Sequence, residues 1–501
     1  MDRRGFLRSS LSAAVAAAMP GAKALAALQL HAPTSVAADI DAVTGDGAQV
    51  TLPRAAVQEL SDSLRGKLLL PGNAGYDDAR SVLSAEFDRH PALIVQPTGA
   101  ADVQSAVDFA RDHSLLLAVK CGGHSAAGKS SCDKGLQIDL SQLRDARVDR
   151  AAKTARIAGG SLLGELDHEA MAHGLVTTAG SVSHTGVGGL TLGGGFGRLG
   201  RRFGLTIDNV LEMDIVTPDG KLRRVGPHNE PDLYWALRGG GGNFGVVTSF
   251  LFQLHEMQRE VVSGNIAYPL SEAKQILRFF AEYSADIPDE LGLSAGVGNR
   301  LGQEPGVNIN FVWSGDAAGA GPIVESLRKA GTVVSESVRS MDYVALQRSG
   351  DSAGGDVRDF TGHMKSGFFG SITDRMIDDL VDSFEARPER ATRFRFGRTG
   401  GAIGRVANAD TAFAHRDSRY DLMSFVSWKT ADDGTAHVKY LKACWSKVEA
   451  LSLGFYVNDL YDESQEAVNQ TYRENFPRLL KIKKQYDPGN LFRLNANIRA
   501  V

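Results

Sequence analysis

Hydrophobic residues change their spacing along residues 91–119 in the order strand, helix, strand. A short apolar run over 93–95 is typical of a buried strand, and residues 103–110 repeat at helical spacing. A second apolar run covers 115–119 and leads into Cys121-Gly122-Gly123-His124-Ser125. The pattern predicts a strand, helix, strand unit that ends in this loop.

The next hundred residues continue this alternation, except where glycine interrupts it. The pattern predicts strands at 136–140, 154–158 and 245–254. It also predicts a helix near 162–173. The glycine-dense residues 180–204 predict loops. Pro218-Asp219-Gly220 separates the apolar runs 210–216 and 221–225, which predicts a hairpin.

The pattern changes after residue 254, where helices near 270–284 and 322–330 alternate with short strands such as 307–313. We therefore place a domain boundary near Met257. The chain ends in a basic helix around 476–484, which Tyr486-Asp487-Pro488 stops.

Composition limits the class of protein. At 501 residues and 43% hydrophobic, the chain is long enough for more than one core, so two domains are expected. The net charge of -4 does not indicate binding to nucleic acid or anionic lipid, because both attract positively charged proteins. Past the first thirty residues, no stretch approaches the roughly 20 apolar residues of a membrane span. Cys121, Cys132 and Cys444 are too few for a disulfide framework, although the first two could pair.

Residues 1–27 have the order of an export signal. Arg3-Arg4 stand in a basic start, an alanine-rich apolar stretch follows, and Ala24-Leu25-Ala26 supplies small residues for cleavage. We interpret this as a twin-arginine signal, which predicts a periplasmic or secreted protein. An ordinary Sec signal or a membrane anchor is the alternative, disfavoured because the apolar run is short and broken by Pro20.

Glycine is concentrated in two segments, 186–200 and 239–245. Such loops let backbone amides approach a phosphate, although tight turns alone are the alternative. Both segments contain a formal G-x-G-x-x-G. The first follows more glycine and the second leads into a strand, so neither has the context of a Rossmann site.

Cys121 and His124 have the spacing of half a zinc site. No second ligand pair stands at a finger-like distance, so no metal is predicted. On spacing alone, His124 is either an ordinary loop histidine or a functional one.

Several specific motifs follow one another in residues 88–255 and 395–498. They are Val119-Lys120-Cys121-Gly122-Gly123-His124-Ser125, Gly186-Val187-Gly188-Gly189, Asp208-Asn209-Val210, Asp232-Leu233-Tyr234-Trp235, Gly242-Asn243-Phe244-Gly245, His415-Arg416 and Tyr486-Asp487-Pro488. Together they resemble the berberine-bridge-enzyme-like branch of the vanillyl-alcohol oxidase superfamily. The resemblance implies an α+β fold, with a two-part FAD-binding domain of the para-cresol methylhydroxylase type and a substrate domain built from an antiparallel sheet and helices.

The same resemblance implies a division of the chain and a cofactor. The FAD-binding domain is expected over 28–256, with its core at 88–256, the substrate domain over 257–453, and a segment returning to the FAD domain over 454–501. His124 is expected to bond covalently to the 8-methyl carbon of the flavin. The further residues expected at the cofactor are Lys120, Gly122, Gly123, Ser125, Gly128, Gly180, Ser181, His184, Thr185, Gly188, Gly189, Gly194, Gly245, Val247 and Asn458.

Departures from the family pattern change the expected chemistry. Val182 stands where many relatives have a second flavin-linking cysteine, so a single attachment is predicted. Where relatives place a catalytic glutamate or tyrosine, this chain has Arg405 and Asp459. Asp459 is the first candidate for the base, since burial beside a flavin would raise its pKa, although a plain surface aspartate is the alternative. Tyr456 is the second candidate and His184 the third.

We therefore expect an FAD-dependent oxidase of a hydroxyl-bearing small molecule, sugar-like or a secondary metabolite. Thr185 stands where a valine in relatives admits oxygen and a leucine excludes it, and its shape predicts oxygen as the acceptor. A dehydrogenase that uses another acceptor and a flavoprotein without catalysis are the alternatives. No motif in residues 257–394 names the substrate.

Overall fold

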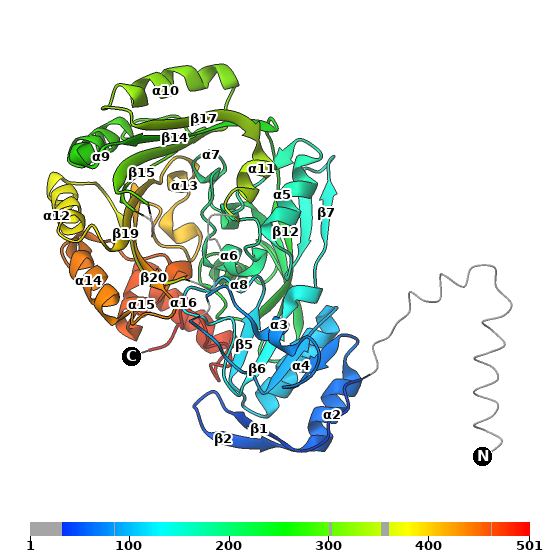
Figure 1. The fold of residues 1–501 in the computed structure, drawn as a ribbon. Coiled ribbons are helices and arrows are strands. Elements are labelled where there is room, and N and C mark those ends of the chain that lie inside the picture. The colour runs from blue at the N-terminus through cyan, green and yellow to red at the C-terminus, as the bar shows by residue number, and fades with distance from the viewer. Residues whose placement is uncertain (1–32, 85, 300–302, 352–359, 462, 501) are drawn as a thin grey trace, which may run out of the picture.

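The computed structural model describes residues 33–84, 86–299, 303–351, 360–461 and 463–500. The export signal predicted over 1–27 lies outside them. The fold is α+β, with three larger sheets that helices cover (Figure 1). No helix in the described ranges is both long and apolar enough to cross a membrane.

The first sheet has the strand order β3-β4-β6-β5, with the last three strands parallel. Its strands are β3 (Lys67–Leu69), β4 (Leu93–Gln96), β6 (Leu136–Asp139) and β5 (Leu117–Lys120). Helix α4 (Ala100–Asp112) connects β4 to β5 and buries Val103 and Val107, which confirms the predicted unit. Around this sheet lie β1 (Ile40–Val43), β2 (Gln49–Leu52), α2 (Arg54–Ser63) and α3 (Tyr76–Arg80).

The second sheet is antiparallel, with the order β11-β10-β12-β8-β7. Its strands are β11 (Leu222–Val225), β10 (Val210–Val216), β12 (Val246–Gln253), β8 (Thr154–Ala158) and β7 (Ala146–Asp149). β10 pairs directly with β11, which confirms the predicted hairpin. The other elements of this part are α5 (Leu163–Met171), α8 (Pro231–Leu237), and the short pair β9 (Leu175–Val176) and β13 (His255–Glu256).

The prediction of loops over 180–204 was wrong for two segments, α6 (Val187–Gly193) and α7 (Gly200–Phe203). Glycine serves close packing in α6, because a Cβ on Gly193 would lie only 2.2 Å from Oδ1 of Asn458. The helix can therefore contact the C-terminal segment directly, and the low helix propensity of glycine is overridden.

The third sheet has seven antiparallel strands in the order β17-β14-β16-β15-β19-β20-β18. They are β17 (Ser335–Asp342), β14 (Glu260–Tyr268), β16 (Gly306–Trp313), β15 (Leu291–Gly298), β19 (Ala391–Arg398), β20 (Tyr420–Lys429) and β18 (Phe360–Phe369). Its outer face is covered by α9 (Ala273–Tyr283), α10 (Ala320–Arg328), α12 (Asp374–Glu385) and α14 (Thr435–Trp445) (Figure 1). The opposite face is turned toward α6, α7, α11 (Tyr343–Arg348) and α13 (Ala402–Arg405).

The last segment contains α15 (Gln465–Thr471) and α16 (Phe476–Tyr486), and its apolar side chains pack with those of the second sheet. Asn243 fastens the chain end, since its Nδ2 donates to the carbonyl of Ala496 at 2.9 Å and its Oδ1 accepts from Ile498 at 3.1 Å. The three cysteines lie in the described ranges and are free, so Cys121 and Cys132 are not paired.

Candidate active site

The loop that carries His124 leaves the end of β5 and lies against the start of α6. Nζ of the buried Lys120 donates to the carbonyl of Ala79 at 2.7 Å and fixes the strand end. A Cβ on Gly122 would lie 2.3 Å from the backbone nitrogen of Gly186. Glycine is therefore required for the two loops to meet, and Gly123 turns the chain with a φ of +71°.

His124 contacts a second histidine from the facing loop. Its Nε2 lies 2.7 Å from Nδ1 of His184, and the hydroxyl of Thr185 lies 3.3 Å from its Nδ1. Burial, together with repulsion from His184, lowers the pKa of His124 to about 4. The imidazole is therefore neutral at pH 7 and keeps a lone pair for bonding.

An open glycine and buried oxygens without partners would suit a polar nucleotide such as FAD near α6. A Cβ on Gly189 would meet nothing within 4 Å, although Gly186 and Gly188 beside it are closely packed. The buried side-chain oxygens of Thr191 and Asn495 have no hydrogen-bond partner among the described residues. Because buried polar atoms are normally bonded, an open glycine surface and unbonded oxygens are what a bound nucleotide would need.

The C-terminal segment approaches α6 from its other end. Asn458 Nδ2 donates to the carbonyl of Leu190 at 3.0 Å and to the hydroxyl of Tyr456 at 2.7 Å. That hydroxyl also accepts from the backbone nitrogen of Gly195 at 2.8 Å, and Gly194 packs on the Tyr456 ring. Burial raises the pKa of Tyr456, so its phenol stays protonated and orients the loop.

Asp459 follows directly and faces the seven-stranded sheet. Burial raises the pKa of Asp459 to about 6, and Asp421 adds to this rise, whereas Ser366 and Arg395 oppose it. Arg395 and Asp421 form an ion pair at 2.9 Å on neighbouring strands β19 and β20. A carboxylate with a pKa near 6 is largely ionised at pH 7 and accepts a proton readily.

Aromatic side chains from three separate segments form a wall beside Tyr456. The Phe196 ring centroid lies 5.1 Å from that of Tyr456, 5.6 Å from that of Phe368 and 5.8 Å from that of Phe413. His415 stacks on Phe368 at 4.7 Å. The wall limits the access of water to this side of Tyr456.

Other residues expected at the cofactor have structural partners. Gly245, with a φ of +149°, lies against the carbonyl of Val216, and Val247 lies in the core of the second sheet. Gly128 closes a turn onto the carbonyl of Ser125 at 3.0 Å. Gly180 has a φ of +50°. Ser181 is exposed, and its carbonyl accepts from Nη2 of Arg198 at 3.1 Å.

The structure gathers His124, His184, Thr185 and Gly122 in one place, and Gly194, Tyr456 and Asn458 at the far end of α6. Sequence reasoning missed Ser366, Arg395 and Asp421 around Asp459. A period-two alternation along β18, β19 and β20 was the available signal, because buried core residues alternate there with residues of the opposite face.

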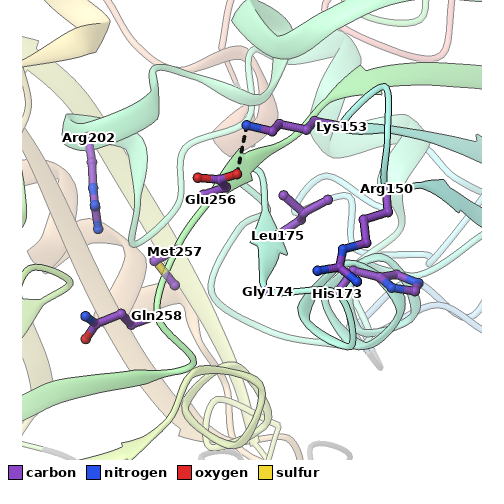
Figure 2. Close-up of a pocket in the computed structure, with 9 residues that line it drawn as sticks. All are labelled: Arg150, Lys153, His173, Gly174, Leu175, Arg202, Glu256, Met257 and Gln258. Atoms are coloured by element: carbon purple, nitrogen blue, oxygen red, sulfur yellow. Dashed lines mark ion pairs between the residues drawn. The ribbon is translucent and has the colours of Figure 1, made fainter.

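A separate hollow lies by β9 and β13 and is lined by basic side chains together with Glu256 (Figure 2). Lys153 pairs with Glu256 there at 2.8 Å. None of the residues predicted for flavin or catalysis lines this hollow.

Known proteins are similar to this chain in both sequence and fold. Residues 91–226 match the family model described as "FAD binding domain" and residues 455–499 match the model described as "Berberine and berberine like". An FAD-linked oxidoreductase of Dictyostelium discoideum is 31% identical over 452 residues, 89% of this chain and 97% of that protein. The chitooligosaccharide oxidase of Gibberella zeae is 26% identical over 85% of this chain and 91% of that protein.

A solved structure has the same fold along most of its length. The crystal structure of 6-hydroxy-D-nicotine oxidase from Arthrobacter nicotinovorans superposes with a TM-score of 0.79 at 27% identity, over 87% of this chain and 98% of that one. These findings confirm the resemblance in the motifs, and the histidine loop, the glycine helix and the C-terminal segment lie together as that resemblance requires. The chain belongs to the berberine-bridge-enzyme-like family of FAD-linked oxidoreductases and is an FAD-dependent oxidoreductase.

Proposed function

We propose that this protein is an oxidase that removes a hydride from a hydroxyl-bearing small molecule and passes the electrons to dioxygen. The observation that carries the proposal is Asp459, a half-buried carboxylate whose pKa is raised to about 6 by desolvation, next to the segment that contacts α6. Oxidation of an alcohol needs a base for the hydroxyl proton, and a carboxylate with a pKa near 6 can accept that proton near neutral pH.

The residues around Asp459 have separable tasks. Asp459 takes the hydroxyl proton, and the Arg395–Asp421 pair offers polar contacts to further hydroxyl groups. Phe196 and the aromatic side chains around it limit water. FAD, when bound, accepts the hydride at its ring. Tyr456 keeps its proton and holds the backbone at Gly195, so we assign the base to Asp459 and positioning to Tyr456.

The proposed attachment of FAD is a single covalent bond to His124. Its neutral imidazole and the absence of a thiol at Val182 support this. Flavin should remain in the pellet after acid precipitation, and a tryptic flavopeptide should contain His124. His124→Ala should release the flavin, whereas the control variant His168→Ala, an exposed residue of α5, should not. Yellow supernatant from the unchanged protein would contradict the assignment.

The substrate class is tested by flavin bleaching without oxygen. The named relatives suggest a panel of oligosaccharides, hydroxylated aromatic compounds and cyclic amines. A substrate should bleach the flavin anaerobically and release hydrogen peroxide in air. Bleaching with no peroxide in air, but with turnover of an artificial dye, would favour a dehydrogenase. No bleaching across the panel would favour a flavoprotein without catalysis.

We also propose export by the twin-arginine route, on the strength of Arg3-Arg4 and the small residues at 24–26. Residues 1–27 fused to a reporter that is active only when exported folded should give signal outside the cytoplasm. Changing both arginines to lysine should abolish it, and continued export through the Sec route would refute the proposal.

A further inference from the structure

The pair His124 and His184 leaves the two ring nitrogens of His124 in different surroundings. Nε2 is held by Nδ1 of His184 at 2.7 Å, a full-strength hydrogen bond. Nδ1 faces the hydroxyl of Thr185 at 3.3 Å, beyond the usual length for such a bond. A hydrogen bond at one ring nitrogen decides which nitrogen carries the proton and which keeps the lone pair.

We propose that His184 is a positioning residue for attachment of the flavin, which holds Nε2 of His124, directs the new bond to Nδ1 and accepts the Nε2 proton. The proposal rests on the covalent bond to His124 proposed above. His184 acts through His124 and is not assigned a contact with substrate.

The lone pair of His124 Nδ1 forms a bond to the 8-methyl carbon of FAD, and that carbon loses one hydrogen as a proton. The imidazole loses its Nε2 proton to Nδ1 of His184. Two electrons pass into the flavin ring, and dioxygen then takes these two electrons and two protons as hydrogen peroxide.

Backbone contacts on both sides of His184 hold its ring in place. The carbonyls of Ser183 and Thr185 accept from the backbone nitrogens of Gly164 at 2.8 Å and Leu163 at 2.9 Å. The nitrogen of Ser183 donates to Oδ1 of Asp351 at 2.8 Å. A side chain whose neighbours are tied to the start of α5 can fix the ring of His124 with little loss of entropy on bonding.

The chemistry of the pair suits proton acceptance better than other residues in contact with His124. Thr185 offers a hydroxyl, which is a poor base at neutral pH. Alkylation at Nδ1 gives the imidazole a positive charge while Nε2 still bears its proton, so a base already within 2.7 Å of Nε2 removes this charge. General base assistance of this kind is worth roughly 100-fold or more in rate.

The test measures attachment of the flavin, not turnover. Full-length protein from riboflavin-starved cells is incubated with FAD in air, and covalent flavin is followed as fluorescence of the acid-washed protein. The variants are His184→Leu, His184→Ala and His184→Asn, whose amide oxygen can accept the hydrogen bond from Nε2 but cannot take its proton. His168→Ala, on an exposed position of α5 near the same loop, is the control.

We expect His184→Leu and His184→Ala to bind FAD but to attach it roughly 100-fold more slowly. His184→Asn should attach FAD about as slowly as these two variants but keep a single isomer, because its amide oxygen holds Nε2 without taking the proton; the control should match the unchanged protein. Histidyl-flavin released by digestion should be the Nδ1 isomer in the unchanged protein and a mixture of isomers in the leucine and alanine variants.

Three results would overturn the role of His184: attachment in the leucine and alanine variants within about twofold of the unchanged protein, an asparagine variant as fast as the unchanged protein, or an Nε2 linkage in the unchanged protein. The alanine variant keeps the test decisive if leucine disturbs folding. Failure of the underlying function is distinguishable, because the unchanged protein would then carry no covalent flavin.

Discussion

Replacing Asp459 by asparagine should stabilise the fold while it slows catalysis, and both effects have one cause. Burial raises the pKa of Asp459 from 3.8 to about 6, with Asp421 adding to the rise and Ser366 and Arg395 opposing it. One pKa unit corresponds to about 1.4 kcal/mol between protonation states, so ionised Asp459 lowers the free energy of unfolding by about 3 kcal/mol and destabilises the fold.

The direction in which stability changes with pH depends on which state binds more protons. The unfolded carboxyl ionises near pH 3.8 and the folded one near pH 6, so the folded state binds more protons between these values. Stability is therefore lost as pH rises through this window and stays lower above it. Asparagine has no charge to bury, so the advantage of Asp459→Asn should grow from roughly 1.5 kcal/mol at pH 5 to about 3 kcal/mol at pH 8.

Catalysis should change in the opposite direction. With ionised Asp459 as the proposed base, kcat/KM of the unchanged protein should fall about tenfold per pH unit below 6 and level off above it. Asp459→Asn should lose roughly 100- to 10,000-fold in the rate of flavin reduction.

Urea unfolding at pH 5 and pH 8 and anaerobic stopped-flow flavin reduction measure the two effects. Asp286→Asn, at an exposed carboxylate, is the control and should change neither. A difference in unfolding free energy that is the same at both pH values would refute the buried-carboxylate argument. A reduction rate within tenfold of the unchanged protein would refute the role as base.

Three further outcomes are expected. Thr185→Leu should slow reoxidation of the reduced enzyme by oxygen and leave reduction by substrate intact, and equal reoxidation rates in stopped flow would favour the dehydrogenase alternative. Asp208→Asn should cost about 3 to 5 kcal/mol in urea unfolding, because Arg416 stays buried after losing its counter-charge and one of its two bonds of 2.6 and 2.7 Å; a loss under 1 kcal/mol would refute this. Tyr456→Phe should lower the rate but keep the pH midpoint near 6, since Asp459 sets it; loss of the midpoint would make Tyr456 the base.

Local sequence patterns predict those helices and hairpins whose buried face is determined by the residues of the element itself. Helix α4 and the hairpin of β10 and β11 lie where periodicity and the turn sequence place them. Strand order is not local: β6 is inserted between β4 and β5, although it follows both in the sequence. The glycine-based prediction of a loop was wrong for α6. A loop needs glycine for its φ angle, whereas α6 needs it for its small size, because the helix packs against Asn458.

The candidate site divides in the same way. His124 and Asp459 stand in recognisable motifs, so they could be named from the sequence. Ser366, Arg395 and Asp421 could not, since alternation along a strand tells which residues share a face but not what that face meets. The burial that raises the pKa of Asp459 comes from a sheet assembled from distant strands, which no short window contains.

Several polar residues in the motifs could be catalytic by residue type, but in the structure they join distant segments of the chain. We call these contacts joints. Asp208 binds Arg416, which lies between β19 and β20 in the chain, and Asn243 binds the chain end at Ile498. Arg405, at the position of a glutamate in relatives, lies 62% exposed in an ion pair with Asp289. Arg405 therefore takes no part in these joints, and the base that we propose, Asp459, stands in a different segment of the chain.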